Sequence, residues 1–295
     1  MPSLGRPLVA RLVPHHVACI FARAAAFALL LAGLLVAPRA LEAQVRPLNP
    51  MGWSTFERPG GVFVMGSAFL AGQRISLAGA EGHLYEFGVF EVTWSYERIA
   101  IRIGGTLLRV FDERKIYAEP VTDTRPPDGS SRTGAGAIEV STLIWLTPPA
   151  APVAVAFRFG TRLPTTDNRE GLGRDQADFF TTIGVRRRAG PWDLSVEGGA
   201  GINGTRDPAH EQIDPILFVG AARYDAGQVD PFLEFTGQHD PRSDRDRRGN
   251  ENLGEVRLGV VIGSQRWLKV SLARGWTSTS PDLGITAQFG TRFGG

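Results

Sequence analysis

A run near the middle of the chain alternates between two kinds of side chain. VAVAFRFGTRLP at 153–164 places Val, Phe and Leu at every second position, with Ala, Arg and Gly between them. Successive side chains of an extended strand point to opposite sides, so a strand sorts this run onto two faces. One face is oily, and the other carries Arg158 and Arg162. The run therefore fits a wall between an apolar phase and water.

The N-terminal segment has the composition of an export signal. Three arginines precede an uncharged apolar run, AAAFALLLAGLLVA at 24–37. That run is shorter than the roughly 20 residues of a membrane-spanning helix. Ala43 is a small residue suited to a cleavage position. We therefore predict a cleaved signal peptide over 1–43 and a single domain over 44–295, with an uncleaved anchor as the alternative.

Charge and cysteine content exclude some functions of the predicted exported chain. The chain has 32 basic and 30 acidic side chains. Removing residues 1–43 takes away four arginines and Glu42, which leaves 28 basic and 29 acidic side chains and a net charge of −1. This balance argues against a nucleic-acid partner. The single cysteine, Cys19, precedes the apolar run, so disulfides and thiol chemistry are excluded after it.

Alternating segments continue to the C-terminus. No segment after Ala43 has the length and apolarity of a membrane helix, so an integral protein would have to be a barrel. In the segment 84–95 the apolar residues change face near Val89, and in 215–225 both rows are apolar, which predicts β-bulges or a less polar lumen. The clean strands are 99–107, 153–163, 179–186, 192–203 and 283–293, and weaker ones are 62–72, 84–95, 137–147, 215–225, 230–239, 253–263 and 266–277.

The lengths of the connections support a barrel. About 12 strands is an even number, and bacterial barrels alternate short periplasmic turns with longer outer loops. We therefore predict an all-β fold, a transmembrane antiparallel up-and-down β-barrel in the bacterial outer membrane, against a soluble β-sandwich as the alternative. Tight turns are predicted at 96–98, 147–150, 189–191, 225–228 and 263–265, and longer connections at 72–83, 111–135, 164–177, 204–214, 239–252 and 277–282.

Aromatic residues fall near the ends of the predicted strands. Trp and Tyr collect at membrane interfaces, where an amphipathic ring meets both phases. Two belts are therefore predicted. Trp94, Tyr96, Trp145, Trp192, Tyr224, Phe232 and Trp267 lie beside the tight turns, and Tyr85, Phe111, Phe179 and Trp276 mark the opposite rim.

Ionisable residues on the predicted inner rows are the candidate solute-path residues. If they point inward, the arginines on two consecutive strands form a positive stripe opposed by Glu197 on the next strand. Such a stripe would attract anions, or it would pair internally and close the lumen. Bracing of the barrel interior is the structural alternative. The candidates are Arg158, Arg162, Arg186, Arg188 and Glu197, followed by a mixed-sign lining of Glu234, Glu255, Arg257 and Lys269.

Catalytic and metal chemistry are not indicated. His83, His210 and His239 all fall in predicted outer loops, without a nucleophile and base placed together, so no catalytic residue and no enzyme activity are predicted. Acidic residues in 239–252 have a loose calcium-like spacing, but arginines interleave with them, so no metal or cofactor is expected. Those arginines are Arg245, Arg247 and Arg248, which would suit lipopolysaccharide phosphates.

Two segments resemble known outer-membrane barrels. The last strand ends in apolar outward residues and Phe293, similar to the C-terminal signal by which such barrels are recognised for assembly; this implies the barrel-assembly machinery as a partner. The segment 157–180 resembles the strand–loop–strand signature of the outer-membrane barrel family named after the meta-pathway of phenol degradation, although Thr166 replaces the usual Gly. The matching residues are Leu163, Pro164, Thr165, Asp167, Gly171, Gly173 and Asp178.

That resemblance implies a transport barrel for a hydrophobic or aromatic solute. A barrel of about 12 strands is narrower than a general porin, so its lumen should be restricted. We expect a barrel that passes or binds a small solute by passive diffusion, in contact with outer-membrane lipid and lipopolysaccharide. The alternative is a structural or surface-interaction barrel with a closed lumen and functional outer loops. The loop 111–135 is long enough to fold inward as a plug, with a solvated surface loop as the alternative.

Overall fold

The structure is a computed structural model. It describes residues 42–43, 60–75, 80–116, 131–165, 172, 176–204, 212, 214–241, 252–277, 280 and 282–293. All of them belong to the larger of two compact units, residues 39–295. Within these ranges no helix is long and apolar enough to cross a membrane.

The described residues form β-strands joined by turns. In chain order they are β1 (Glu42–Ala43), β2 (Gly60–Ile75), β3 (Ala80–Tyr96), β4 (Ile99–Ile116), β5 (Ser131–Gly134), β6 (Ile138–Trp145), β7 (Val153–Leu163), β8 (Asp178–Ala189), β9 (Trp192–Asn203), β10 (Ile216–Tyr224), β11 (Val229–His239), β12 (Leu253–Gly263), β13 (Arg266–Gly275) and β14 (Leu283–Phe293).

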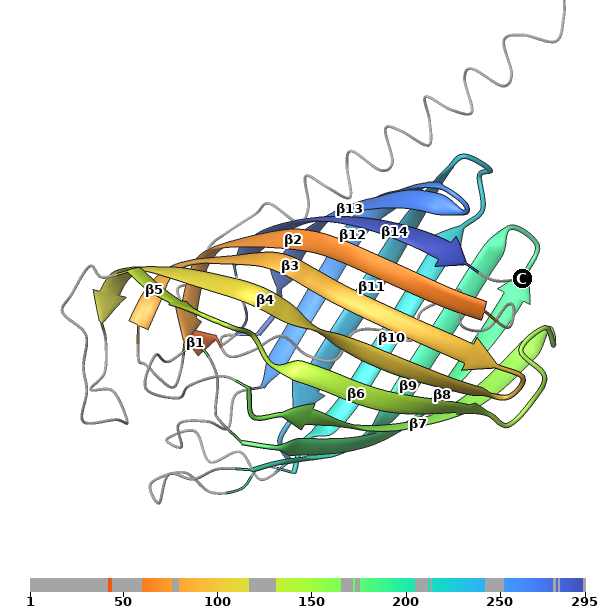
Figure 1. Cartoon of the computed structure of the whole chain (residues 1–295), viewed down its shortest axis with the longest axis horizontal. Helices are drawn as coiled ribbons and strands as arrows, with labels where there is room; N and C mark the ends of the chain where they lie inside the picture. Colours follow the sequence, from red (N-terminus) through yellow and green to blue (C-terminus); the bar gives the residue numbers. More distant parts are fainter. Residues whose placement is uncertain are drawn as a thin grey trace, which may run out of the picture. The chain divides into compact units, whose positions relative to one another are not determined.

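Twelve of these strands close into an antiparallel ring (Figure 1). The order follows the chain from β2 to β14, and β2 pairs with both β14 and β3 to close the ring. Two short strands stand beside it: β5 pairs with β4, and β1 pairs with β2 in parallel. The predicted up-and-down barrel of about 12 strands is confirmed. Cleavage after Ala43, which stays a prediction, would remove β1 and leave the ring intact.

Short turns gather at one end of the ring, which we call the turn end; the other is the loop end (Figure 1). Gly190 and Gly227 have φ values of 58° and 98° in two of these turns, a conformation that glycine adopts without a steric penalty. Gly61 pairs with Phe293, so the start of β2 and the end of β14 also lie at the turn end. The five predicted tight turns are confirmed.

Three strands are longer than the sequence predicted. β2, β3 and β4 have 16, 17 and 18 residues, and they keep pairing beyond the rest of the ring. Residues 72–75, 80–83 and 111–116, expected in loops, are therefore strand. The pairing is irregular where these strands were expected to end: the β2–β3 register shifts between Leu70 and Gln73, and the β3–β4 register shifts between Glu81 and Gly82. A further irregularity lies inside the predicted strands. The β2–β3 register passes from Gly66↔Val89 to Ser67↔Phe87, and the bypassed Gly88 has a φ of 63°. This is the predicted bulge near Val89.

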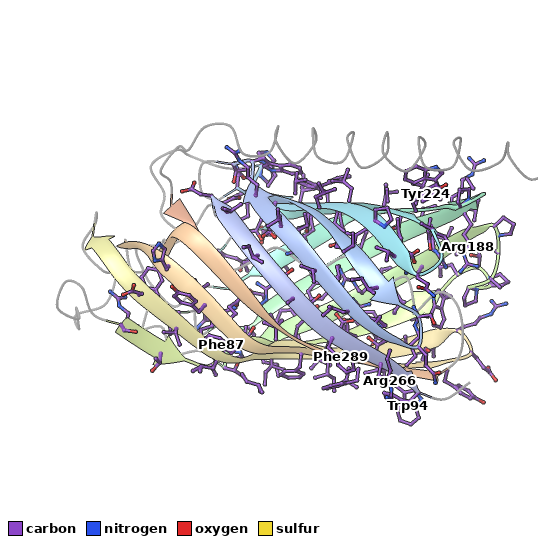
Figure 2. The ribbon with its side chains drawn as sticks, turned by 90° about the horizontal axis from the view of Figure 1, so that it is seen from above. Phe87, Trp94, Arg188, Tyr224, Arg266 and Phe289 are labelled. Atoms are coloured by element: carbon purple, nitrogen blue, oxygen red, sulfur yellow. The ribbon has the colours of Figure 1, made fainter. Side chains whose placement is uncertain are left out.

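The outer face of the ring is apolar. On β4, Ile101 and Leu107 point outward, with Leu107 61% exposed, while Arg102 and Thr106 between them are buried. The same alternation runs along β7, β8 and β9. Figure 2 shows Phe87 and Phe289 projecting from the wall, and Trp94 near the turn end. An apolar outside and a polar inside are typical of a barrel that faces lipid.

The aromatic belts are only partly as predicted. Trp94 is 70% exposed, and Tyr96, Trp192, Phe179 and Trp276 are exposed as well. Four other rings point inward instead. Trp145, Phe111 and Phe232 are buried, and Trp267 packs against an inner apolar cluster. Aromatic content marked the strand ends correctly, but a one-residue difference in face reverses where a ring points.

Candidate functional site in the barrel lumen

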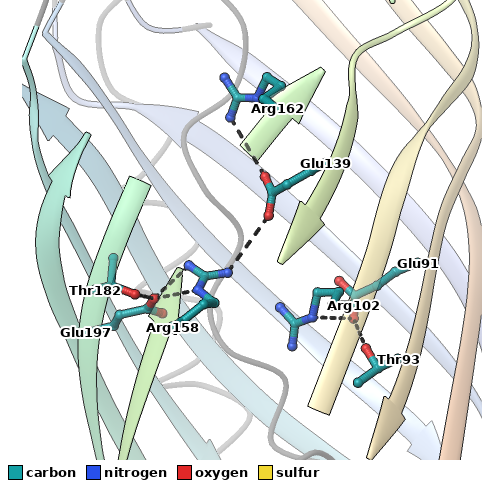
Figure 3. A network of polar contacts seen from close by, with 8 residues as sticks. All are labelled: Glu91, Thr93, Arg102, Glu139, Arg158, Arg162, Thr182 and Glu197. Atoms are coloured by element: carbon teal, nitrogen blue, oxygen red, sulfur yellow. Dashed lines mark hydrogen bonds and ion pairs between the residues drawn. The ribbon is translucent and has the colours of Figure 1, made fainter. Parts of the chain in front are cut away.

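Arg158 is the centre of a charged network inside the barrel (Figure 3). It lies on β7 and is 1% exposed. Its Nε donates to Oε1 of Glu197 on β9 at 2.8 Å, and its Nη2 lies 2.6 Å from the same oxygen. The hydroxyl of Thr182, on the intervening strand β8, donates to that oxygen too. The guanidinium carbon is 5.2 Å from the ring centre of Phe180. Three adjacent strands are thus cross-linked by one buried charge pair.

Glu139 on β6 extends this network toward the loop end. Its carboxylate oxygens lie 4.0 Å from Arg158 Nη1 and 4.0 Å from Arg162 Nη2 (Figure 3). Arg162 is also 3.5 Å from Asp178. These longer distances make Glu139 a loosely held bridge between two guanidinium groups.

A second cluster lies on β11, β12 and β13. Lys269 Nζ donates to Glu234 Oε1 at 2.7 Å and stands 4.4 Å from the ring centre of Phe232. Arg257 donates to Glu255 at 2.5 Å, with Glu234 3.9 Å away. Glu234 and Glu255 are fully buried. All four predicted residues of the mixed-sign lining are therefore brought together.

Further pairs line β3 and β4. Arg102 Nε is 3.5 Å from Glu91, whose carboxylate also accepts a 3.4 Å hydrogen bond from Thr93 (Figure 3). Nearer the loop end, Arg109 Nε donates to Glu86 at 2.9 Å. The inward ionisable residues of this wall are thus also paired across neighbouring strands.

Two hairpins at the turn end carry the same charged clamp. Arg186 donates to Asp193 at 2.7 Å across the β8–β9 turn, and Arg223 donates to Asp230 at 3.0 Å across the β10–β11 turn. Both hairpins have the sequence Arg-x-x-Ala-Gly-x-x-Asp. The Asp230 carboxylate also accepts the backbone N–H of Ala226 at 2.9 Å. Asp193 and Arg223 are register partners, so the clamps are adjacent.

The sequence left open whether the arginines form a free positive stripe or pair with carboxylates inside the barrel. In the structure they are paired. Arg158, Arg162 and Arg186 each face a carboxylate, and no uncompensated positive stripe forms among them. Arg188 does not join the lining; it is exposed beside Gly190 at the turn end (Figure 2). Sequence reasoning missed the partners because register decides which residues meet. Those partners are Glu139, Asp178, Asp193 and, in the second clamp, Arg223 and Asp230.

Two clusters of apolar side chains lie on the inner face at the turn end, beside the hairpin clamps. Ala100, Leu143, Trp145, Ala154 and Ala156 form a buried cluster on β4, β6 and β7. On β10 to β13, Ala221, Phe232 and Val261 form another, with Trp267 packed against it. The lumen thus has a charged middle layer and an apolar layer at the turn end.

The family-like loop is described only at its edges. Thr165 accepts the N–H of Ile138 at 3.0 Å and donates to the Gly136 carbonyl at 3.0 Å, which fixes the end of β7 to the start of β6. Leu163, Pro164 and Asp178 are described as well. Asp167, Gly171 and Gly173 lie outside the described residues, as do Thr166, His210, 117–130 and the arginine-rich 242–251.

Two of the predicted loop histidines are in strands: His83 lies in β3 and His239 ends β11. Within the described ranges, no three His, Cys, Asp or Glu side chains are arranged to hold a metal ion.

Similarity to known proteins is confined to the fold. No protein-family model matches the sequence, and no curated protein matches it. The structure is similar to that of an outer-membrane channel from Pseudomonas putida F1, with a TM-score of 0.57 and 12% sequence identity over 88% of this chain and 100% of that chain. The translocator domain of the autotransporter NalP from Neisseria meningitidis gives a TM-score of 0.43 and 11% identity over 94% and 97% of the two chains. The chain therefore has the fold of an outer-membrane β-barrel.

Proposed function

We propose that this barrel resides in the outer membrane and passes a small solute by passive diffusion along its inner face. The observation that carries the proposal is the distribution of charge. Ionisable side chains occupy inward positions on strand after strand, whereas the outward positions are apolar. A protein that only needed a stable interior would gain as much from apolar residues, because burying charges costs desolvation energy.

The paired lining favours small solutes over strong selection by charge. Among the described residues, seven inward arginines have a carboxylate within 4.0 Å: Arg102, Arg109, Arg158, Arg162, Arg186, Arg223 and Arg257. A passing ion therefore meets neutral pairs rather than a field of one sign. The solute-path residues proposed are those predicted from sequence, except that Arg188 would act only at the turn-end mouth.

The solute class remains a proposal based on the family resemblance. A hydrophobic or aromatic solute would find the rings of Phe180 and Phe232 on the inner face, each beside a cation. These rings offer stacking surfaces next to hydrogen-bond donors. No enzymatic step is proposed.

The second candidate is a structural barrel with a closed lumen. The burial of Arg158 to 1% favours it, since a group on an open channel would be solvated. In that case the ion pairs brace the wall, and function lies in the outer loops.

Conductance of the purified protein in planar lipid bilayers separates the two functions. If the barrel passes solutes, it should give discrete conductance steps in KCl. A heat-modifiable gel shift first establishes that the protein is a folded barrel. Absence of steps, both from the intact chain and from a variant lacking 117–130, would overturn the proposal and favour the closed barrel. Deleting this segment removes an inward-folding loop as an explanation for silence.

The proposed partners follow from the surface. The exposed apolar band would contact outer-membrane lipid, and lipopolysaccharide would lie at the loop end. The barrel-assembly machinery would bind β14, whose Phe289 and Phe293 are exposed on the outer face. Replacing Phe293 with Ser should lower the amount of folded barrel in the membrane fraction relative to Phe293→Tyr.

A further inference from the structure

We propose that the apolar layer at the turn end is the permeability barrier of the barrel, with Trp145 and Phe232 as its principal side chains. The inference rests on the proposed passage of solute through the lumen and names where that passage is limited. Hydrophobic constrictions restrict ions because water leaves an apolar passage readily, and an ion cannot shed its hydration there without replacement ligands.

One wall of this layer is built around Trp145, the last residue of β6. Its side chain points inward and is only 2% exposed. Leu143 precedes it on the same inner row, and the facing positions on β7 are Ala154 and Ala156. Trp145 pairs in register with Ala156. The small alanines leave room for the indole, so this wall places its largest apolar group at the turn end.

The second wall is built around Phe232 on β11, with Val261 on β12 and Trp267 on β13. Glycines lie under its rings. A Cβ on Gly259 would come within 2.7 Å of the Phe232 ring, and one on Gly290 within 2.1 Å of Trp267. The rings therefore pack against bare backbone. β6 and β12 are six places apart in the ring of twelve, so the two walls face each other.

One hairpin clamp lies on the strands between these walls, and the other lies on β10 and β11, beside Ala221 and Phe232 of the second wall. Arg186–Asp193 spans β8 and β9, and Arg223–Asp230 spans β10 and β11. Each clamp is neutral and closes within its own hairpin. Apolar side chains and neutral pairs thus line the turn end on β4 and β6 to β13, with Lys269 of the Glu234 cluster stacked against Phe232 at its inner edge, whereas Arg158 lies farther inside.

This arrangement should favour uncharged solutes over ions. A hydrated ion passes several charged groups in the middle layer, whereas at the turn end the charged groups of the two clamps are already paired with each other and the remaining neighbours are apolar. A compact solute with little charge loses less there, because apolar side chains replace its water at low cost. The barrier should therefore retard salts more than uncharged solutes of the same size.

Single-channel conductance in KCl tests the barrier, using the exported chain in planar bilayers. Trp145→Ala and Phe232→Ala should each raise conductance at least about twofold, because each removes a large apolar group from the barrier. Trp145→Phe should stay near the parent value. The matched controls are Trp192→Ala, outward at the same end, and Leu268→Ala, outward on β13 next to Trp267; both should leave conductance unchanged. A heat-modifiable gel shift establishes folding of each variant.

The outcomes separate the two proposals. If the parent conducts and neither Trp145→Ala nor Phe232→Ala changes its conductance, the barrier is refuted and solute passage stands. If the outward controls raise conductance equally, the effect is general loosening and the barrier is again refuted. If the folded parent, its variant lacking 117–130 and the alanine variants are all silent, solute passage fails and the barrier fails with it. Phe232→Ala keeps the test decisive should Trp145→Ala not fold.

Discussion

The charged middle layer and the apolar turn-end layer occupy the same inner rows of the same strands, yet they are held in opposite ways. On β7, Arg158 faces the lumen only two residues from Ala156, and both are buried. The arginine is fixed by a carboxylate two strands away, at 2.6 Å. The alanine is fixed by the bulk of Trp145 opposite it. Strand alternation decides which residues face inward, and the neighbouring strands decide whether that position can hold a charge.

This difference predicts unequal responses to mutation. Removing one member of a buried pair leaves a charge without its partner, whereas trimming an apolar group loses packing alone. The middle layer should therefore be sensitive to single substitutions and tolerant of paired ones.

The largest effect is expected at Glu197. Glu197→Ala removes the carboxylate that binds Arg158 and Thr182, and should lower the free energy of unfolding by about 3–5 kcal/mol, because a guanidinium stays buried without a close partner. Urea unfolding of the lipid-reconstituted barrel measures this. The double variant Arg158→Met/Glu197→Leu should recover most of the loss. A single variant that costs under about 1 kcal/mol would mean that water solvates Arg158 and that the middle layer is open.

A smaller effect is expected at the turn-end clamp. Asp230→Ala removes the acceptor for Arg223 and for the Ala226 N–H, and should cost about 1–3 kcal/mol in the same assay. Asp225→Asn on the same turn is exposed and should change stability by no more than about 0.5 kcal/mol. Equal losses from the two substitutions would show that the clamp adds nothing to the turn.

The smallest difference in stability is expected between two threonine-to-valine substitutions. Thr182→Val removes a donor to the buried Glu197 carboxylate and should cost about 1–2 kcal/mol. Thr93→Val removes only a 3.4 Å hydrogen bond to the half-buried Glu91, and should cost less than about 0.5 kcal/mol. Urea midpoints in the reverse order would contradict the ranking of the two networks.

The fold was more predictable than the lumen, for a physical reason. Strand alternation is local, so 153–163, the bulge near Val89 and the turn at Gly190 are all recoverable from sequence. Ion pairing depends on register between strands, so Glu139 and Asp178 could not be matched to Arg162 in advance. The face of Trp145 was missed because its strand contains Ser141 and Thr142 in succession, which blurs the two rows.

A repeated spacing in the sequence indicates the two hairpin clamps. Arg186 and Arg223 each precede an aspartate by seven residues, across an Ala-Gly turn. In both hairpins this spacing places the two positions on the same face of adjacent strands, so the repeated spacing alone would have predicted both clamps.

We propose that the inner charge pairs border the path of the solute, which the reversal potential in a KCl gradient can report. Arg158→Glu combined with Arg162→Glu places two added carboxylates beside Glu139, Glu197 and Asp178. The reversal potential should shift toward that of a cation-selective channel relative to the parent protein. Arg158→Gln with Arg162→Gln should produce a smaller shift of the same sign. An unchanged reversal potential in a folded, conducting charge-reversal variant would contradict the claim, because the two arginines would then lie off the ion path.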